Sequence, residues 1–349
     1  MSEHIALYRK YRPASFKDVI GQDHVVEVLK KAISDENVAH AYLFAGGRGT
    51  GKTTVARIVA KEIGTSAKDL YEMDAASNRR IEDFRELNES VHTLPFDSKY
   101  KVYIIDEVHM LTKEAFNAFL KTLEEPPKHV VFILATTEIE KLPDTIVSRC
   151  QTHTFHKPTR SVLASAVLKV AKAEKVTLEK DAAELIAILG EGSFRDALGT
   201  LQKVLSYSSD KTITRSEVES VTGAPRGEIV NAALVAISEG NLDEALVNVG
   251  KALETSVDFL TFQKLLLDRV RAVMLLRNSS GMRTALKEQF NKEDFELLEK
   301  LAKDTTSKAN LRVLQALLGA YADTSHAYIA QLPLELALVE SLQEKSEQH

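Results

Sequence analysis

The residues best suited to chemistry form a glycine-rich pattern in the N-terminal part of the chain. The segment Gly46-Gly47-Arg48-Gly49-Thr50-Gly51-Lys52-Thr53 matches G-x-x-x-x-G-K-[ST], with Thr54 following it. An apolar run at 41–45 precedes this segment and a helical pattern follows it. Backbone N–H groups at the helix N-terminus would therefore surround a phosphate, Lys52 would neutralise its charge, and Thr53 would offer a hydroxyl to Mg²⁺. A tight strand–helix turn without a ligand is the alternative, and the strand–loop–helix context disfavours it.

A pair of acidic residues follows a second apolar run. Residues 102–105 read as a strand, and Asp106 and Glu107 come directly after it, at the edge where parallel α/β sheets bind ligands. Asp106 is suited to hold Mg²⁺ through a water, and Glu107 to polarise an attacking water. The alternative is that these residues are only a solvated acidic pair at a strand end, and the presence of the phosphate loop disfavours it. His109 follows closely, but a single histidine there is more often packed than catalytic, and we assign it no role.

Three further groups of residues carry weaker signals. The strand 132–135 ends in two hydroxyls, Thr136 and Thr137, which could position the attacking water or report a γ-phosphate. Taken alone, Arg149 and Arg195 indicate only surface ion pairs. Arg79 and Arg80 precede a helical pattern. They could contact a DNA phosphate, or they could pair with the acids at 82–83, and the sequence favours neither interpretation.

Apolar runs and helical patterns alternate in the first part of the chain. Strands are predicted at 41–45, 70–73, 102–105 and 130–135, with helices at 25–33, 51–63, 81–91 and 113–123. Strands that are apolar throughout predict a parallel sheet flanked by helices, hence an α/β domain. Residues 1–22 read as irregular. Helical periodicity dominates after Pro158, and a Gly/Pro break occurs at 222–225, so the predicted domains are 1–157, 158–222 and 223–349.

Composition limits the remaining possibilities. The 349 residues carry a formal net charge of -5, which gives no bulk electrostatic argument for nucleic-acid binding. One cysteine, Cys150, excludes a disulfide within the chain and a multi-cysteine zinc site. The N-terminus has no apolar run of signal-peptide length, and no stretch approaches the length of a membrane span, so a cytoplasmic protein is expected.

Several segments together resemble the AAA+ ATPases of clamp loaders, and in particular the bacterial DNA polymerase III γ/τ subunits. The segments are 6–13, 16–22, 74–78, 102–111, 120–127, 134–138 and 148–150, and they occur in the family's order. The resemblance implies a P-loop AAA+ domain, a small helical lid and an all-α collar. It implies that Arg149 is an arginine finger acting in trans, Thr137 the first sensor and Arg195 the sensor of the lid. It also implies an adenine pocket formed by Tyr8, Arg9, Arg12, Pro13, Val19 and Ile20.

The family's activity implies ATP and Mg²⁺ as ligands and several macromolecular partners. These would be the δ and δ′ subunits, further copies of this chain, the sliding clamp and primed DNA, within DNA polymerase III. The family usually inserts a four-cysteine zinc module where this chain has only 64–69, so no zinc is expected. The chain ends where longer τ-like members of the family continue. We therefore expect a chain of γ-like length, which is either its natural length or the result of truncation. Another AAA+ DNA machine, such as a branch-migration helicase, and a non-hydrolysing assembly subunit are the alternatives.

Overall fold

The computed structural model describes residues 5–78, 81–208, 211–254 and 258–343. The chain divides into two compact units. The first comprises Met1–Leu163 with Gly190–Gly199, and the second Ala164–Leu189 with Thr200–His349. The division into 1–157, 158–222 and 223–349 stays a prediction.

The first unit is built on one sheet in which all strands run parallel. Its strands are β1 (Ala41–Gly46), β2 (Leu70–Asp74), β3 (Lys101–Asp106), β4 (Val130–Thr136) and β5 (Gln151–Phe155), in the order β2-β3-β4-β1-β5. The predicted parallel sheet is therefore confirmed. Strand β5 was not predicted, because its sequence QTHTF has no apolar run. Only His153 and Phe155 are buried in this edge strand.

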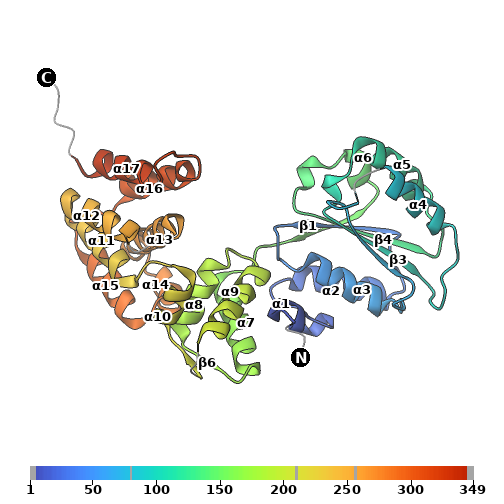
Figure 1. Ribbon diagram of the computed structural model, residues 1–349, viewed down its shortest axis with the longest axis horizontal. Helices are drawn as coiled ribbons and strands as arrows, with labels where there is room; N and C mark the ends of the chain where they lie inside the picture. Colours follow the sequence, from blue (N-terminus) through green and yellow to red (C-terminus); the bar gives the residue numbers. More distant parts are fainter. Residues whose placement is uncertain (1–4, 79–80, 209–210, 255–257, 344–349) are drawn as a thin grey trace. The chain divides into compact units, whose positions relative to one another are not determined.

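Helices cover both faces of this sheet (Figure 1). Helices α2 (Asp23–Ser34) and α3 (Lys52–Glu62) pack against side chains such as Tyr42 and Phe44. Leu43, between these two, faces the other layer, which consists of α4 (Ile81–Val91), α5 (Lys113–Glu124) and α6 (Asp144–Val147). Adjacent β1 residues thus serve opposite layers, as the alternation of side chains along a strand requires.

Four short helices complete the first unit. They are α1 (Leu7–Lys10), η1 (Phe16–Asp18), η2 (Val108–Met110) and η3 (Ile139–Lys141). The expectation that residues 1–22 are irregular was therefore wrong for α1 and η1. Their turns form because Leu7 and Phe16 are buried, and such short helices gain their stability from packing rather than from local propensity.

The connection from α3 to β2 is held by one buried carboxylate. Asp69 is 1% exposed and accepts hydrogen bonds from the backbone N–H groups of Phe96, Asp97 and Ser98 at 2.5, 2.9 and 2.9 Å. Burial alone would raise the pKa of Asp69, but these bonds hold it well below its usual value. The short segment 64–69 is therefore anchored to the loop before β3. Within the described ranges, no group of three or more His, Cys, Asp or Glu side chains could hold a metal ion.

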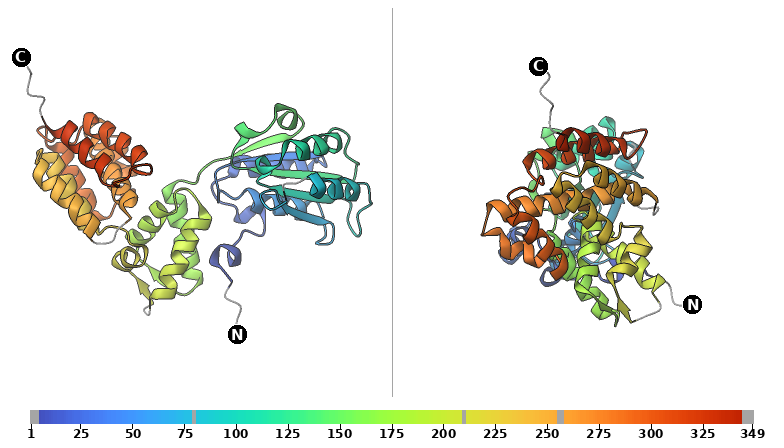
Figure 2. Two further views of the ribbon diagram at one scale, coloured as in Figure 1. Left: turned by 45° about the horizontal axis from the view of Figure 1, so that its top comes forward. Right: turned by 90° about the vertical axis from the view of Figure 1, so that its left-hand side faces the viewer.

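The second unit is almost entirely helical. A small parallel ribbon of β6 (Thr177–Leu178) and β7 (Thr212–Ile213) is an exception to the predicted loss of strands after Pro158. In the described part of this unit the remaining elements are helices joined by loops (Figure 2). The helices are α7 (Arg160–Ala173) and α9 (Phe194–Tyr207), which extend from the first unit, then α8 (Lys180–Leu189), α10 (Arg215–Thr222), α11 (Gly227–Glu239), α12 (Leu242–Glu254), α13 (Phe259–Asn278), α14 (Met282–Gln289), α15 (Lys292–Lys303), α16 (Leu311–Thr324) and α17 (Leu332–Leu342).

Helix α13 carries a buried ion pair into the core of this unit. Arg269 donates to Asp294 of α15 at 3.1 Å and to Asn231 of α11 at 2.8 Å. Asn231 in turn donates to the second oxygen of Asp294 at 2.7 Å. The three side chains therefore satisfy one another and join three helices. None of the helices within the described ranges is long and apolar enough to cross a membrane.

Candidate nucleotide-binding site

The glycine-rich loop leaves the carboxyl end of β1 and enters α3. A Cβ at Gly46 would lie 2.3 Å from the carbonyl oxygen of Phe155 in β5, so only glycine permits this close approach. Gly49 has φ +71°, and a Cβ there would lie 2.0 Å from Ser193 Oγ. Both glycines are therefore required by their surroundings as well as by the turn.

Lys52 is buried under the loop to which it belongs. Its Nζ donates to the carbonyl oxygens of Gly46 and Gly47 at 2.7 and 2.9 Å. Burial lowers the pKa of Lys52, and the carboxylates of Glu107 and Asp106 oppose that effect. The ammonium group thus sits inside the loop, with two acids near enough to act on it.

Thr53 and Asp106 form a direct pair from adjoining elements. The Thr53 hydroxyl, in the first turn of α3, donates to Asp106 Oδ2 at the end of β3, at 2.7 Å. Hydroxyl and carboxylate oxygens are hard ligands of the kind that Mg²⁺ prefers. The donor set at this position therefore fits the magnesium ion expected from the sequence.

Glu107 meets the predicted first sensor at the ends of β3 and β4. Thr137 donates to Glu107 Oε2 from its hydroxyl at 3.0 Å and from its backbone N–H at 3.3 Å. Glu107 has φ +50°, a left-handed conformation that costs energy for a residue with a side chain. The tertiary structure therefore holds this carboxylate in a defined place beside Asp106.

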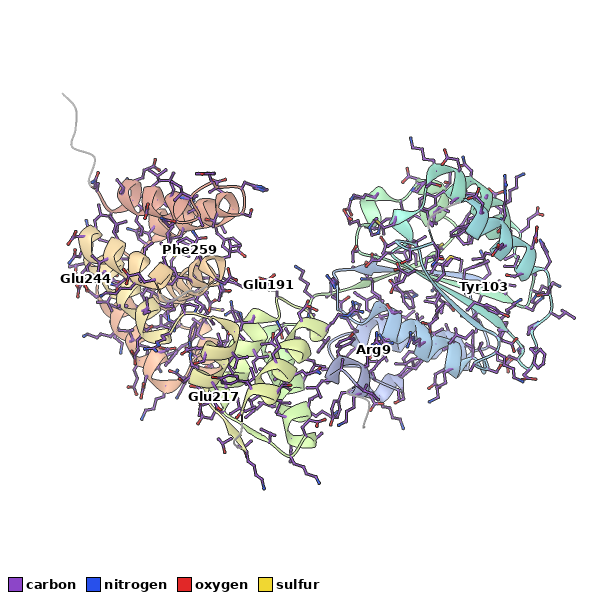
Figure 3. The ribbon with its side chains drawn as sticks, viewed as in Figure 1. Arg9, Tyr103, Glu191, Glu217, Glu244 and Phe259 are labelled. Atoms are coloured by element: carbon purple, nitrogen blue, oxygen red, sulfur yellow. The ribbon has the colours of Figure 1, made fainter. Side chains whose placement is uncertain are left out.

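Residues 190–199 bring the predicted lid sensor to the same loop. The Phe194 N–H donates to the Gly49 carbonyl at 3.0 Å. The Arg195 guanidinium lies 5.5 Å from the centre of the Tyr8 ring, a cation–π distance. Arg9, on α1 and labelled in Figure 3, lies 5.8 Å from the same ring. The structure thus brings the start of α9 to the phosphate loop and Tyr8 to Arg195.

The other residues of the predicted adenine pocket lie in the same N-terminal segment. Burial lowers the pKa of Arg12, and the charges of Arg57, Arg195 and Arg9 lower it further. Val19 packs against the core between the sheet and α2–α3, Pro13 is half-buried, and Ile20 is exposed.

Gln22 is a residue whose importance sequence reasoning missed. Its buried amide donates to the His156 carbonyl at 2.7 Å and to the Thr50 carbonyl at 3.4 Å, and accepts from the His156 N–H at 3.2 Å. It therefore joins the N-terminal segment, the phosphate loop and the strand end after β5. Its place in the Asp18–Gln22 motif was the available signal.

Arg149 follows α6 and lies on the surface. Its guanidinium donates to the Thr145 carbonyl at 2.8 Å and pairs with Glu124 at 2.5 Å, with side chains 34% and 48% exposed. Among the contacts between described residues, none joins Arg149 to Lys52, Asp106 or Glu107. Burial raises the pKa of the neighbouring Cys150 thiol to about 12, which disfavours the thiolate form. Arg79 and Arg80, the predicted DNA contacts, lie outside the described residues.

Comparison with solved structures defines the class of this protein. The Thermotoga maritima RuvB Holliday junction branch migration motor aligns with a TM-score of 0.53 and 23% identity, over 74% of this chain and 91% of that one. At this identity the likeness concerns the fold. Together with the phosphate loop, it defines a P-loop protein of the AAA+ class with a helical C-terminal region.

Comparison of sequences identifies the family. The DNA polymerase III subunit tau of Bacillus subtilis is 36% identical over 85% of this chain and 56% of its own length. The subunit gamma/tau of Mycoplasma pneumoniae is 39% identical over 73% of this chain and 40% of its own length. The family described as DNA polymerase III, delta subunit, matches residues 65–159. The chain belongs to the DNA polymerase III γ/τ family, and it spans about half the length of these two curated relatives.

Proposed function

We propose that this chain binds ATP with Mg²⁺ and hydrolyses it as the motor subunit of a clamp loader. One observation carries the proposal: the hydroxyls of Thr53 and Thr137 and the carboxylates of Asp106 and Glu107 meet beside Lys52. Phosphoryl transfer requires positioning and charge stabilisation more than covalent chemistry, and this set can supply both.

Each side chain has a role that its contacts support. Lys52 exchanges its hydrogen bonds to loop carbonyls for stronger, charge-assisted bonds to phosphate oxygens. Thr53 and Asp106 hold Mg²⁺, which when bound neutralises phosphate charge. Glu107 accepts a proton from the attacking water, and Thr137 keeps its carboxylate in place.

The sensor arginine and the arginine finger act on different sites in this proposal. Arg195, beside Tyr8, contacts the γ-phosphate of its own subunit and couples the lid to the nucleotide. The adenine lies against the segment containing Tyr8, Arg9, Arg12, Pro13, Val19 and Ile20. Arg149 completes the site of a neighbouring subunit, which its exposed position supports. The isolated chain should therefore turn over ATP slowly.

Exposed apolar side chains support assembly through the collar, residues 223–349. They lie on α16, on α17 and between these helices: Leu311, Leu318, Tyr328, Leu332 and Leu336. Large exposed apolar groups mark interaction surfaces when they gather on adjoining elements. We propose that the partners are further copies of this chain and the δ and δ′ subunits. The assembly would open the sliding clamp and load it on primed DNA in the bacterial cytoplasm.

The test is ATP turnover of the chain mixed with δ and δ′, with and without sliding clamp and primed DNA. Clamp and DNA together should stimulate turnover strongly. Glu107→Gln should keep ATP binding and abolish turnover, whereas the exposed Glu27→Gln on α2 should change neither. Turnover that ignores clamp and DNA would favour another AAA+ DNA machine. Binding without turnover in every mixture would favour an assembly subunit.

A further inference from the structure

His109 lies against the candidate catalytic carboxylate, although the proposed chemistry gives it no role. It belongs to η2 and its side chain is 5% exposed. Its Nδ1 is 3.0 Å from Thr136 Oγ1 and 3.5 Å from Glu107 Oε2, and its Nε2 is 3.1 Å from Glu138 Oε1. Both ring nitrogens therefore face polar groups from the end of β4 or its continuation.

The hydrogen-bond directions around this ring can be assigned. The hydrogen bond from Lys141 holds the pKa of Glu138 below its usual value, so this carboxylate is ionised at neutral pH and only accepts. Nε2 of His109 therefore donates to Glu138. The Glu138 backbone N–H donates to Thr136 Oγ1 at 3.0 Å, and in the neutral ring with its proton on Nε2 that hydroxyl donates its hydrogen to Nδ1. These bonds close a ring of three residues.

This cycle of hydrogen bonds fixes the position of the imidazole beside Glu107. Thr136 is fully buried, so its hydroxyl has no competing water. The same Glu107 oxygen that lies 3.5 Å from Nδ1 accepts both hydrogen bonds from Thr137. One carboxylate oxygen of Glu107 is thus in contact with both Thr137 and the ring of His109.

We propose that His109 is a positioning residue for Glu107, held in place by Thr136 and Glu138. This inference rests on the proposed function, because it assumes that Glu107 activates the attacking water. His109 touches neither ATP nor water in this role. It restricts the carboxylate to one orientation, and orientation decides how well a general base works. Its removal should therefore lower kcat and spare nucleotide binding.

The main test compares variants in the complex of this chain with its clamp-loader partners. His109→Ala should lower kcat about tenfold, as loss of a supporting side chain commonly does, and leave ATP affinity within about twofold. His109→Gln should recover part of the rate, because an amide can donate to Glu138 and accept from Thr136. Glu138→Gln, which keeps the shape of the side chain, should lower kcat by a smaller factor, and it serves as a second variant if His109→Ala does not fold.

His129→Ala is the matched control. This ring is half-buried in the same unit, and its Nε2 lies 3.1 Å from the carbonyls of Val91 and Thr93. His129 precedes the amino end of β4, whereas Glu107 follows the carboxyl end of the parallel strand β3. Its loss should lower the thermal unfolding midpoint without lowering kcat.

Three results separate this inference from the proposed function. If Glu107→Gln abolishes turnover while His109→Ala and Glu138→Gln keep the kcat of His129→Ala, the positioning role is refuted and the ATPase proposal stands. If His109→Ala weakens ATP binding as much as it lowers kcat, the residue only packs, and the inference also fails. If Glu107→Gln retains full turnover, the proposed function itself is wrong, and the inference falls with it.

Discussion

Replacing Arg149 with alanine should separate stability from catalysis. Arg149 pairs with Glu124 at 2.5 Å, but at least a third of each side chain is exposed. Such surface pairs contribute about 0–1 kcal/mol to the free energy of unfolding, so the midpoint should fall by a few degrees at most. An arginine supplied in trans is worth roughly 10³ or more in phosphoryl-transfer rate, or about 4 kcal/mol of barrier. The loss of turnover should therefore greatly exceed the loss of stability.

The assay measures kcat of the assembled complex and the unfolding midpoint of the chain. Glu124→Gln is the control, because it removes the same ion pair but keeps Arg149, and it should retain turnover. Arg149→Ala and Lys52→Ala chains should each be inactive, whereas mixing them should restore part of the activity. In the mixture, a Lys52→Ala chain donates its Arg149 to an intact site next to it. No recovery on mixing, or an equal loss of rate in the isolated chain, would refute an arginine acting in trans.

Three further predictions follow from individual contacts. Gly49→Ala should lower the thermal midpoint, because φ +71° costs about 1 kcal/mol for alanine and its Cβ would meet Ser193; an unchanged midpoint would contradict this. Asp69 has a depressed pKa when folded, so its contribution is present above pH ~4 and is lost as pH falls further. Denaturant titrations should show a shallower acid loss for Asp69→Asn, and parallel curves would count against the anchor. Arg269→Met should destabilise the second unit by about 3–5 kcal/mol in urea, since Asp294 stays buried; adding Asp294→Leu should recover much of it, and no recovery would be the adverse result.

Local sequence was sufficient to predict the phosphate site. Residues 41–54 form a strand, a turn and a helix in direct succession, so the loop, Lys52 and Thr53 come from one short segment. The acidic pair was predicted for a similar reason, because the strand 101–106 ends at Asp106 and side chains at that edge share one surface. Family resemblance, rather than spacing, suggested roles for Arg149 and Arg195, since a single arginine forms no pattern.

Contacts between distant segments could not be read from any pattern. Gln22 bonds to a residue 134 positions further along the chain, and the edge strand β5 has no apolar run. Similarly, nothing in the sequence of 64–69 indicates that Asp69 takes its hydrogen bonds from the loop at 96–98. These partners are determined by which segments the folded sheet places side by side.

The sequence by itself determined the parallel α/β class, the phosphate loop and the acidic strand end, because each depends on neighbours in the chain. Only the tertiary structure decided that Thr137 holds Glu107 and that His109 is locked beside it by Thr136 and Glu138. The physical reason is that β3 and β4 pair in parallel, so their carboxyl ends meet although a long crossover separates them in sequence. Hydrogen bonds across that edge depend on strand register, which a single sequence does not display.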